Sequence, residues 1–377
     1  MLALRPLLIF GTRPEAIKMA PIVSECRRRS GEIEATVCLT GQHREMLAQV
    51  TEYFAIEADI DLALMRPDQT LAGLTARCLE SLDELLARNR PSCVVAQGDT
   101  TTVMAASLAA FYRHVPFVHV EAGLRTGDLQ APWPEELNRR QADMTSALCC
   151  APTRRAADLL LAEGKPPESV HVTGNTVIDA LLTAVERERA KPGRWQNRYA
   201  MLGDAPMVLI TGHRRESFGP GFERICSAIR LLAQRFPDHQ FVYPVHLNPN
   251  VQRPVKGLLG GQANVHLVEP AIYPEFVWLM DRSTIILTDS GGVQEEAPSL
   301  RKPVLVMRDT TERPEAVEAG AARLVGTSVD AIVDNATRLL TDRGEYSRCQ
   351  IASNPYGDGK AGQRIVDLML RLISVEC

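Results

Sequence analysis

The stretch that decides the fold is Thr284–Ala297 (TIILTDSGGVQEEA), in which an apolar run leads into a glycine turn and then a helical segment. Because glycine has no side chain, the backbone at Ser290, Gly291 and Gly292 could approach a ligand closely. The following helix would present free N–H groups, which suit a phosphate. Glu296, one helical turn past Gly292, could accept hydrogen bonds from ribose hydroxyls. The stretch alone also fits a plain strand–helix connection, so its interpretation as a nucleotide diphosphate site depends on the rest of the chain.

Short apolar runs alternate with amphipathic stretches along the chain, which is typical of βα units and a mostly parallel sheet. The 377 residues are enough for about two domains. The segment 185–200 is rich in charged residues and predicts a helix end and linker. Apolar residues spaced three and four apart predict a helix over 70–89, and Ala361–Ile373 is an amphipathic terminal segment. The predicted strands are Leu7–Phe10, Glu34–Leu39, Cys93–Ala96, Phe117–Val120, Ala147–Ala151, Val170–Val172, Met207–Thr211, Gln240–Tyr243, Val265–Leu267, Ile285–Thr288 and Pro303–Met307.

These elements predict an α/β chain of two domains. The amino-terminal domain covers residues 1–185, the carboxy-terminal domain covers 200–358, and a last helix within 359–377 packs back on the first domain. In open α/β sheets, ligands bind at the carboxyl ends of the strands. Each polar or glycine-rich motif follows a predicted strand directly, so we expect the motifs to share one cleft between the domains.

Composition excludes several classes of protein. The net charge of −4 argues against general nucleic-acid or membrane binding. No apolar run approaches the ~20 residues that cross a bilayer, and the apolar start Leu7–Phe10 is too short for a signal-peptide core. Nine scattered cysteines without a Cys-x-x-Cys pair are typical of reduced thiols in a cytoplasmic protein. The histidines lack metal-ligand spacing, so we expect no metal site.

Three carboxylates follow strands or open helices in the first half of the chain. Asp99 follows the third predicted strand, Glu121 follows the fourth, and Glu135 begins a helix. Each has a structural alternative: Asp99 could cap a helix, Glu121 could pair with Arg125, and Glu135 could be favoured by the helix dipole. Three acids at neighbouring strand ends are nevertheless what a proton-transfer site needs.

Cationic side chains follow other strands. Arg13 and Lys18 lie after the first strand, either as solvated charges of a capped helix or as phosphate contacts. His213 stands beside two arginines at a strand end, which favours an anion contact. Arg313 follows the last predicted strand, on the same side as the Ser290–Gly292 turn. No Gly-x-Gly-x-x-Gly fingerprint follows the first strand, so we do not predict a dinucleotide site.

Seven segments of the chain form one recognisable set. They are Gly11–Pro21 (GTRPEAIKMAP), Gln97–Thr102 (QGDTTT), Glu121–Thr126 (EAGLRT), Pro134–Arg139 (PEELNR), His213–Glu216 (HRRE), Asp289–Ala297 (DSGGVQEEA) and Thr311–Gly320 (TERPEAVEAG). In this order they resemble the non-hydrolysing UDP-N-acetylglucosamine 2-epimerase family. The resemblance implies two Rossmann-like domains of the glycosyltransferase-B type, a homodimer, and no metal or nicotinamide cofactor.

The resemblance also implies roles for individual residues. The residues that would hold UDP are Arg13, His213, Ser290, Gly291, Gly292, Glu296 and Arg313. The catalytic set would be Asp99, Glu121, Glu135, His213 and Lys18. Some bacterial members are activated by their own substrate at a second site, for which the matching positions are Gln42, Arg66, Arg214 and His246. Arg301 stands where the family frequently has a turn glycine.

The implied reaction interconverts UDP-N-acetylglucosamine and UDP-N-acetylmannosamine, which supplies precursors for surface polysaccharide. The hydrogen at C2 is not next to a carbonyl, so its direct abstraction would be slow. The family's route eliminates UDP to form 2-acetamidoglucal and then adds UDP back, with the proton returned to the opposite face of C2. This route requires cations at the departing diphosphate and carboxylates at both faces of C2.

Three other functions stay open at this point. A glycosyltransferase of the same fold would pass the sugar to an acceptor, but it gives no role to three acids. A hydrolysing epimerase would release free N-acetylmannosamine and UDP. A nucleotide-sugar sensor would bind without turnover, and the intact acids at positions 99, 121 and 135 argue against it.

Overall fold

The computed structural model describes residues 3–41, 44–66, 68–212, 214 and 218–374, which form two compact units. Unit 1 combines Met1–Ala180 with Tyr356–Cys377, and unit 2 is the continuous segment Leu181–Pro355. Each unit is a parallel sheet covered by helices, which confirms the predicted fold class.

The sheet of unit 1 has seven parallel strands in the order β3-β2-β1-β4-β5-β6-β7. The central strands β1, β4 and β5 are buried along their whole length, because helices cover both faces of the sheet. The strands are β1 (Pro6–Phe10), β2 (Thr36–Leu39), β3 (Ile60–Asp61), β4 (Cys93–Gln97), β5 (Phe117–Val120), β6 (Leu148–Ala151) and β7 (Val170–Val172).

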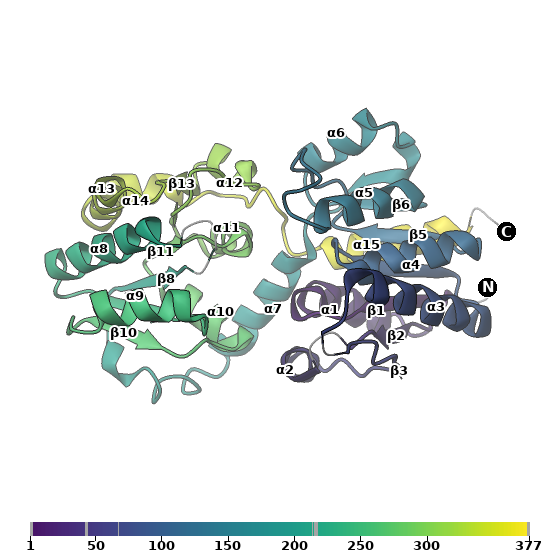
Figure 1. The fold of residues 1–377 in the computed structure, drawn as a ribbon, viewed down its shortest axis with the longest axis horizontal. Coiled ribbons are helices and arrows are strands. Elements are labelled where there is room, and N and C mark those ends of the chain that lie inside the picture. The colour runs from purple at the N-terminus through teal and green to yellow at the C-terminus, as the bar shows by residue number, and fades with distance from the viewer. Residues whose placement is uncertain (1–2, 42–43, 67, 213, 215–217, 375–377) are drawn as a thin grey trace. The chain divides into compact units, whose positions relative to one another are not determined.

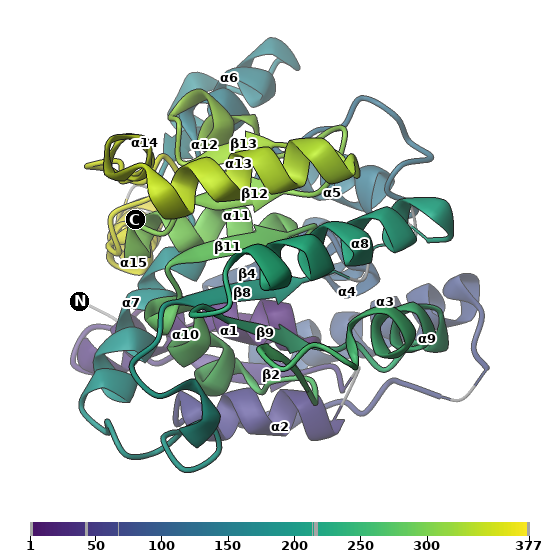
Figure 2. The same cartoon turned by 90° about the vertical axis from the view of Figure 1, so that its left-hand side faces the viewer.

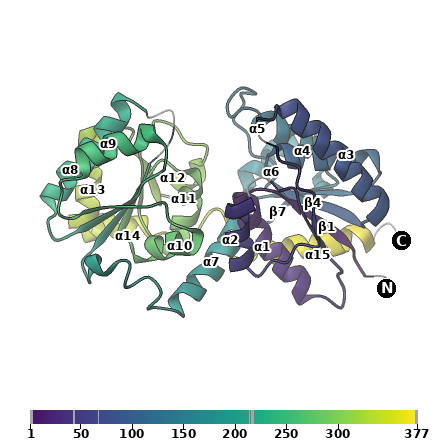
Figure 3. The ribbon, with the colours of Figure 1, turned by 60° about the horizontal axis from the view of Figure 1, so that its bottom comes forward.

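Helices of unit 1 lie on both faces of this sheet, with α1 and α15 opposite α3 and α4 (Figure 3). The predicted helix over 70–89 is confirmed as α3, whose apolar face joins the core formed with α4 and the strands. The helices are α1 (Arg13–Arg28), α2 (Arg44–Tyr53), α3 (Leu71–Asn89), α4 (Thr101–Tyr112), α5 (Glu135–Thr145), α6 (Arg154–Ala162), η1 (Pro167–Ser169) and α15 (Ala361–Ser374). Helix α7 (Thr176–Arg189) begins in unit 1 and continues into unit 2.

The last helix, α15, belongs to unit 1 although unit 2 precedes it in the chain. Figure 1 shows the yellow α15 among the purple and blue elements from the start of the chain. It packs on α1, where Arg29 Nη1 lies 2.6 Å from Asp367 Oδ1. Its first turn is held by Asp179, which accepts a 2.8 Å hydrogen bond from the backbone N–H of Gly362.

Unit 2 repeats the same scheme with six parallel strands in the order β10-β9-β8-β11-β12-β13. The strands are β8 (Met207–Thr211), β9 (Gln240–Pro244), β10 (Val265–Val268), β11 (Ile285–Thr288), β12 (Val304–Val306) and β13 (Ala322–Leu324). Helix α8 packs between α9 and α13 on one face (Figure 2). The helices are η2 (Ala200–Leu202), α8 (Pro220–Arg235), α9 (Pro249–Leu259), α10 (Tyr273–Arg282), α11 (Gly291–Glu296), η4 (Ala297–Leu300), α12 (Pro314–Glu318), α13 (Val329–Thr341) and α14 (Arg343–Cys349).

The strand order explains where functional side chains gather in each unit. All the strands predicted from the sequence are present, and β3 and β13 are two short edge strands that were not predicted. The order reverses between β1 and β4 in unit 1 and between β8 and β11 in unit 2. Ligands of open α/β sheets bind at the carboxyl ends of the strands at such a reversal. The motifs singled out in the sequence follow these strands.

Candidate functional site

Glu121 follows β5 directly and is nearly buried, with a left-handed backbone at φ +67°. Such strain in a residue other than glycine is concentrated at functional sites. The two carboxylate oxygens lie 2.8 and 2.5 Å from Lys18 Nζ, which forms an ion pair with Glu121. Gln97 at the end of β4 donates to the same carboxylate, and Asn175 Nδ2 lies 3.4 Å from Oε1. The structure thus brings together Lys18 and Glu121, two members of the predicted catalytic set.

Arg125 does not pair with Glu121, so that alternative was wrong. Its guanidinium instead lies 2.7 Å from Asp143 Oδ2 and forms two hydrogen bonds with Glu163. These neighbours raise the pKa of Arg125 against the opposing effect of its burial. The sequence pattern favoured the near neighbour, whereas the actual partner, Lys18, lies on α1 and comes close only through the fold.

Asp99 lies in the loop after β4, but it does not cap the next helix. Thr100 is the cap of α4, and its side chain accepts from the backbone N–H of Val103. The Asp99 carboxylate instead pairs with Arg139, and Asn138 Nδ2 donates to the Asp99 carbonyl at 2.9 Å. About a third of the Asp99 side chain remains exposed. Asp99 is therefore held from behind by α5 while one side of its carboxylate faces solvent.

Glu135 is the first residue of α5 and is half-buried. Its neighbour Glu136 is fully buried and accepts hydrogen bonds from the backbone N–H groups of Thr126 and Gly127. Residues three and four apart share one face of a helix. Glu135 is consequently on the side of α5 that carries Asn138 and Arg139, the two residues that hold Asp99.

Arg13 opens α1, whose start is fixed by an interlocked cap. Thr12 caps the helix, and the buried Glu15 accepts 2.7 Å hydrogen bonds from the N–H groups of Gly11 and Thr12. Burial raises the pKa of Glu15, although hydrogen bonds with Thr100, Gly11 and Thr12 lower it in part. The backbone at Gly11 is so close to β2 that an added Cβ would meet Thr40 Oγ1 at 2.0 Å. The position of Arg13 at the end of β1 is therefore tightly determined.

In unit 2, two arginines stand over the turn that opens α11. A Cβ at Gly291 would lie 3.9 Å from Arg313 Cζ and 4.0 Å from Arg214 Nη2. Arg313 pairs with Glu295, which is buried within α11. The backbone N–H of Arg214 donates to the buried Asp289 at 2.8 Å. Guanidinium groups beside exposed backbone N–H groups are suited to a phosphate.

Ser290 and Glu296 mark the two ends of α11. The Ser290 side chain forms no capping hydrogen bond to the helix, and its N–H donates to Thr288 Oγ1 at 2.9 Å. Glu296 Oε1 lies 3.5 Å from the point where a Cβ on Gly292 would be. Its carboxylate thus turns back toward the start of the helix, where a ribose next to a bound diphosphate would be.

The arginines around the α11 turn also affect the pKa of a neighbouring acid, Glu312. Glu312 is hydrogen-bonded to Arg308, with distances of 3.3 and 3.2 Å. Its burial would raise the pKa of Glu312, but Arg308 and the charges of Arg313 and Arg214 lower it overall. The surroundings of the Ser290–Gly292 turn therefore favour anions.

The residues predicted for a second substrate site are not brought together within one unit. Gln42 and His213 lie outside the described residues, so the structure does not place them. Arg66 is exposed in unit 1, whereas Arg214 and His246 belong to unit 2. His246 Nδ1 accepts a 3.1 Å hydrogen bond from the N–H of Asn248. The second site stays a prediction.

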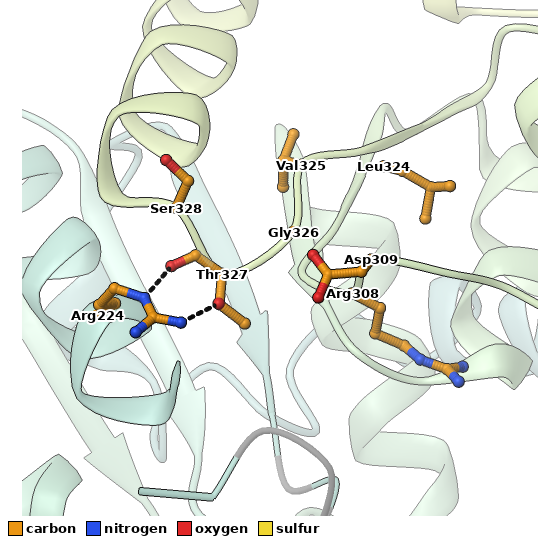
Figure 4. A pocket seen from close by; sticks show the side chains of 8 residues that line it. All are labelled: Arg224, Arg308, Asp309, Leu324, Val325, Gly326, Thr327 and Ser328. Carbon is orange, nitrogen blue, oxygen red and sulfur yellow. Dashed lines mark hydrogen bonds between the residues drawn. The ribbon is translucent and has the colours of Figure 1, made fainter. Parts of the chain in front are cut away.

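Unit 2 also contains a cavity of about 500 Å³ that the sequence did not indicate (Figure 4). Arg224 on one wall donates to Thr327 Oγ1 at 2.8 Å. Asp309 faces Gly326 on the other wall, and a Cβ at Gly326 would meet Asp309 Oδ1 at 2.7 Å. The lining residues are Arg224, Arg308, Asp309, Leu324, Val325, Gly326, Thr327 and Ser328.

Sequence reasoning missed the residues that hold the acids of unit 1. Gln97 and Asn175 contact Glu121, and Arg139 contacts Asp99. Gln97 ends an apolar strand, which is close to the pattern that indicated Glu121, whereas Asn175 lies three positions after β7 and had no such signal. Arg139 lies inside a helix, and its charged neighbours gave no indication of its partner.

These observations first define a class of protein. Two parallel sheets with the same reversal of strand order are features of the glycosyltransferase-B-type fold. The chain belongs to the UDP-N-acetylglucosamine 2-epimerase family, whose sequence profile matches residues 24–370. This match confirms the family and the enzyme class expected from the motifs.

Close relatives match over almost their whole length. A probable UDP-N-acetylglucosamine 2-epimerase from Ralstonia solanacearum is 56% identical, with 95% of this chain and 96% of the relative covered. The UDP-N-acetylglucosamine 2-epimerase of Escherichia coli strain K12 is 52% identical, with 97% and 98% covered. The crystal structure of UDP-GlcNAc 2-epimerase from Neisseria meningitidis bound to UDP-GlcNAc has a TM-score of 0.91 at 48% identity, covering 98% of this chain and 100% of that one.

The described part of the chain has neither a membrane-spanning helix nor a cluster of metal-binding side chains. Within the residues that the structure describes, no helix is both long and apolar enough to cross a bilayer. In the same part of the chain, no group of three or more His, Cys, Asp or Glu side chains is arranged to hold a metal ion. The eight cysteines in the described residues are buried and free.

Proposed function

We propose that the protein interconverts UDP-N-acetylglucosamine and UDP-N-acetylmannosamine by inverting C2 of the sugar, without hydrolysis. The proposal rests mainly on two carboxylates of unit 1 that ion pairs hold in place. Glu121 pairs with Lys18, and Asp99 pairs with Arg139. A transferase or a sensor has no need for several fixed acids.

The chemistry proceeds by elimination and re-addition. A carboxylate removes the proton from C2, the C1–O bond breaks, and its electron pair leaves with UDP. The resulting 2-acetamidoglucal takes up UDP again at C1 and a proton at the opposite face of C2. Two acid–base groups on different faces are needed, and Asp99, Glu121 and Glu135 supply them. Lys18 forms an ion pair with Glu121.

Stabilisation of the departing diphosphate is assigned to unit 2. Arg313 stands over Gly291, beside the N–H groups of the Ser290–Gly292 turn. Such preorganised donors act where negative charge develops, and this is usually a large term in catalysis. Arg13 and His213 complete the set of cations in the proposal, and Glu296 binds the ribose.

We further propose that the protein acts as a cytoplasmic homodimer. The carboxyl-terminal ends of α4 and α5 expose large apolar side chains, with Phe111 at 58%, Tyr112 at 60% and Met144 at 72% exposure. The two helices pack together, and Ser107 Oγ lies 3.3 Å from Gln141 Oε1 between them. Such patches on one face mark interaction surfaces. Light scattering should give a dimer mass that falls toward the monomer mass in a Met144→Glu variant.

The proposal also includes activation by substrate and a pathway role. Gln42, Arg66, Arg214 and His246 are the residues assigned to a second UDP-N-acetylglucosamine molecule. Arg214 is close to the turn of α11, so a second diphosphate would be bound near the first. Epimerisation of UDP-N-acetylmannosamine would then start with a lag that small amounts of UDP-N-acetylglucosamine remove. The product is assigned to surface polysaccharide synthesis.

The deciding experiment uses purified protein, UDP-N-acetylglucosamine and no other substrate. Proton NMR in heavy water should show UDP-N-acetylmannosamine appearing with deuterium at C2. Free UDP and free N-acetylmannosamine accumulating together would instead establish the hydrolysing reaction. No change until an acceptor sugar is added would favour the transferase, and binding without any product would favour the sensor.

A further inference from the structure

His119 lies within β5, two residues before Glu121, and its side chain is fully buried. Its ring contacts two acceptors on opposite sides. Nδ1 lies 2.6 Å from Asp143 Oδ1, and Nε2 lies 2.7 Å from the carbonyl oxygen of Gly98. His119 therefore joins β5 to α5, which carries Asp143, and to the loop that carries Asp99.

The contact with Gly98 requires a proton on Nε2, because a carbonyl oxygen can only accept a hydrogen bond. The contact with Asp143 requires one on Nδ1 as long as Asp143 is ionised. The other oxygen of Asp143 accepts from Arg125 at 2.7 Å and from the N–H of Gly123 at 3.2 Å, which favours the carboxylate. Burial opposes ionisation of Asp143, but His119 and Arg125 lower its pKa overall.

Charges alternate along this network, from the exposed Glu163 through Arg125 and Asp143 to His119. Two other ionisable residues lie near His119. They are Asp99 in the adjoining loop and Cys149 on β6, which is the register partner of His119. Burial lowers the pKa of His119, but Asp143 and the Gly98 carbonyl raise it overall. The hydrogen bonds of this network are therefore all satisfied when the His119 ring is positively charged and donates from both nitrogens.

We propose that His119 is a permanently charged positioning residue whose two N–H donors fix the Gly98–Asp99 loop against α5. This inference rests on the proposed function in one respect, since it assigns the fixed loop to proton transfer by Asp99. The Asp99 carboxylate pairs with Arg139, which is also on α5. Without His119 the loop would keep the hydrogen bonds from Gly98 N–H to the Val120 carbonyl at 3.0 Å and from Asn138 to the Asp99 carbonyl at 2.9 Å. It would lose the link from the Gly98 carbonyl through the ring to Asp143, and Asp99 would shift relative to Glu121.

The charge state is tested without any activity measurement. Protein labelled with ¹⁵N-histidine is titrated by NMR, and the His119 signals are assigned by their loss in a His119→Gln variant. We expect both ring nitrogens to stay protonated from pH 6 to 9. A neutral ring with one unprotonated nitrogen at pH 7 would overturn the proposal. This measurement holds even if the protein proves not to be an epimerase.

The positioning role is tested in the Asp143→Asn variant, with Glu163→Gln at the exposed end of the network as the matched control. Loss of the Asp143 charge lowers the pKa of His119, so the ring gives up its Nδ1 proton as pH rises. Nε2–H still donates to the Gly98 carbonyl, but the charged link from the ring to α5 is lost. We expect kcat to fall on the order of 10- to 100-fold with KM nearly unchanged, and to fall further with rising pH. The control should keep the wild-type pH profile.

Two outcomes would contradict the positioning role. A fall in kcat that is the same at every pH would show that Asp143 acts only in folding. An unchanged kcat would show that the loop does not depend on the charged ring. UDP binding, measured by calorimetry, reports whether unit 2 is intact in each variant, and should be unaltered. If Asp143→Asn fails to fold, the titration of the wild-type protein still decides the charge of His119.

Discussion

The two units hold their functional side chains in different ways. In unit 1, Glu121 contacts Lys18, Gln97 and Asn175, which come from three separate elements. In unit 2, Arg313 pairs with Glu295 at the base of the same turn, and Ser290 makes no capping contact. Proton transfer requires a carboxylate at hydrogen-bond distance from its target, whereas charge attraction acts over a longer range. Tight fixation is thus found where the chemistry is sensitive to small displacements.

The sharpest test of this difference removes an acid of unit 1. Asp99→Asn or Glu121→Gln should lower kcat by about 10²- to 10⁴-fold, because an amide cannot exchange the proton. UDP affinity should change little, since neither residue belongs to unit 2. Rapid-quench assays and calorimetry on the same preparations measure the two quantities. Weakened UDP binding in either variant would show that the acid is misassigned.

The complementary change is made in unit 2. Glu296→Ala should weaken UDP binding by about 1.5–3 kcal/mol, the usual worth of hydrogen bonds to a charged group. A matched control is Glu223→Ala, which removes an exposed carboxylate from α8. Isothermal calorimetry with UDP compares them. Equal UDP affinities of the two variants would show that Glu296 does not bind the ribose.

A third prediction concerns the tie between α7 and α15 in unit 1. Burial raises the pKa of Asp179 to about 6, although the N–H groups of Gly362 and Ala361 lower it in part. The folded state therefore binds a proton more tightly than the unfolded chain, and stability falls as pH rises from about 4 to 6. Asp179→Asn should stabilise the protein by roughly 1–2 kcal/mol at pH 7. The gain should vanish below pH 4, as denaturant titrations at both pH values would show.

The smallest expected effect is at Arg301, which follows η4 in unit 2. Its backbone is left-handed, with φ +55°, a conformation that favours glycine. Arg301→Gly should therefore raise the stability of unit 2 by roughly 0.5–1 kcal/mol, with UDP affinity unchanged. Thermal unfolding followed by calorimetry measures this. A lower melting temperature would mean that the arginine side chain contributes contacts that outweigh the backbone strain.

Much of the fold could be predicted because buried parallel strands are nearly continuous apolar runs. The missed strands, β3 (Ile60–Asp61) and β13 (Ala322–Leu324), are short edge strands with exposed or half-buried positions. Their pairing depends on the neighbouring strand rather than on their own sequence. The capping role went to Thr100 and not to Asp99, since both residue types cap helices and the sequence does not distinguish them.

The sequence singled out candidate residues for the site but not their partners. Glu121 directly follows an apolar strand and Asp99 lies two positions after one, whereas Arg313 lies seven positions after β12. Their partners lie far away in the sequence: Lys18 is separated from Glu121 by 103 positions. Pairing over such distances depends on strand order, which the sequence pattern does not specify.

One feature of unit 1 bears on how the protein is made. Helix α15 packs on α1, and its first turn is held by Asp179, so this unit needs both ends of the polypeptide. Unit 2 is a single continuous segment. Domains fold as units during synthesis, and the amino-terminal part emerges first. On the ribosome, unit 2 can therefore reach its final form before unit 1, which waits until α15 has been translated.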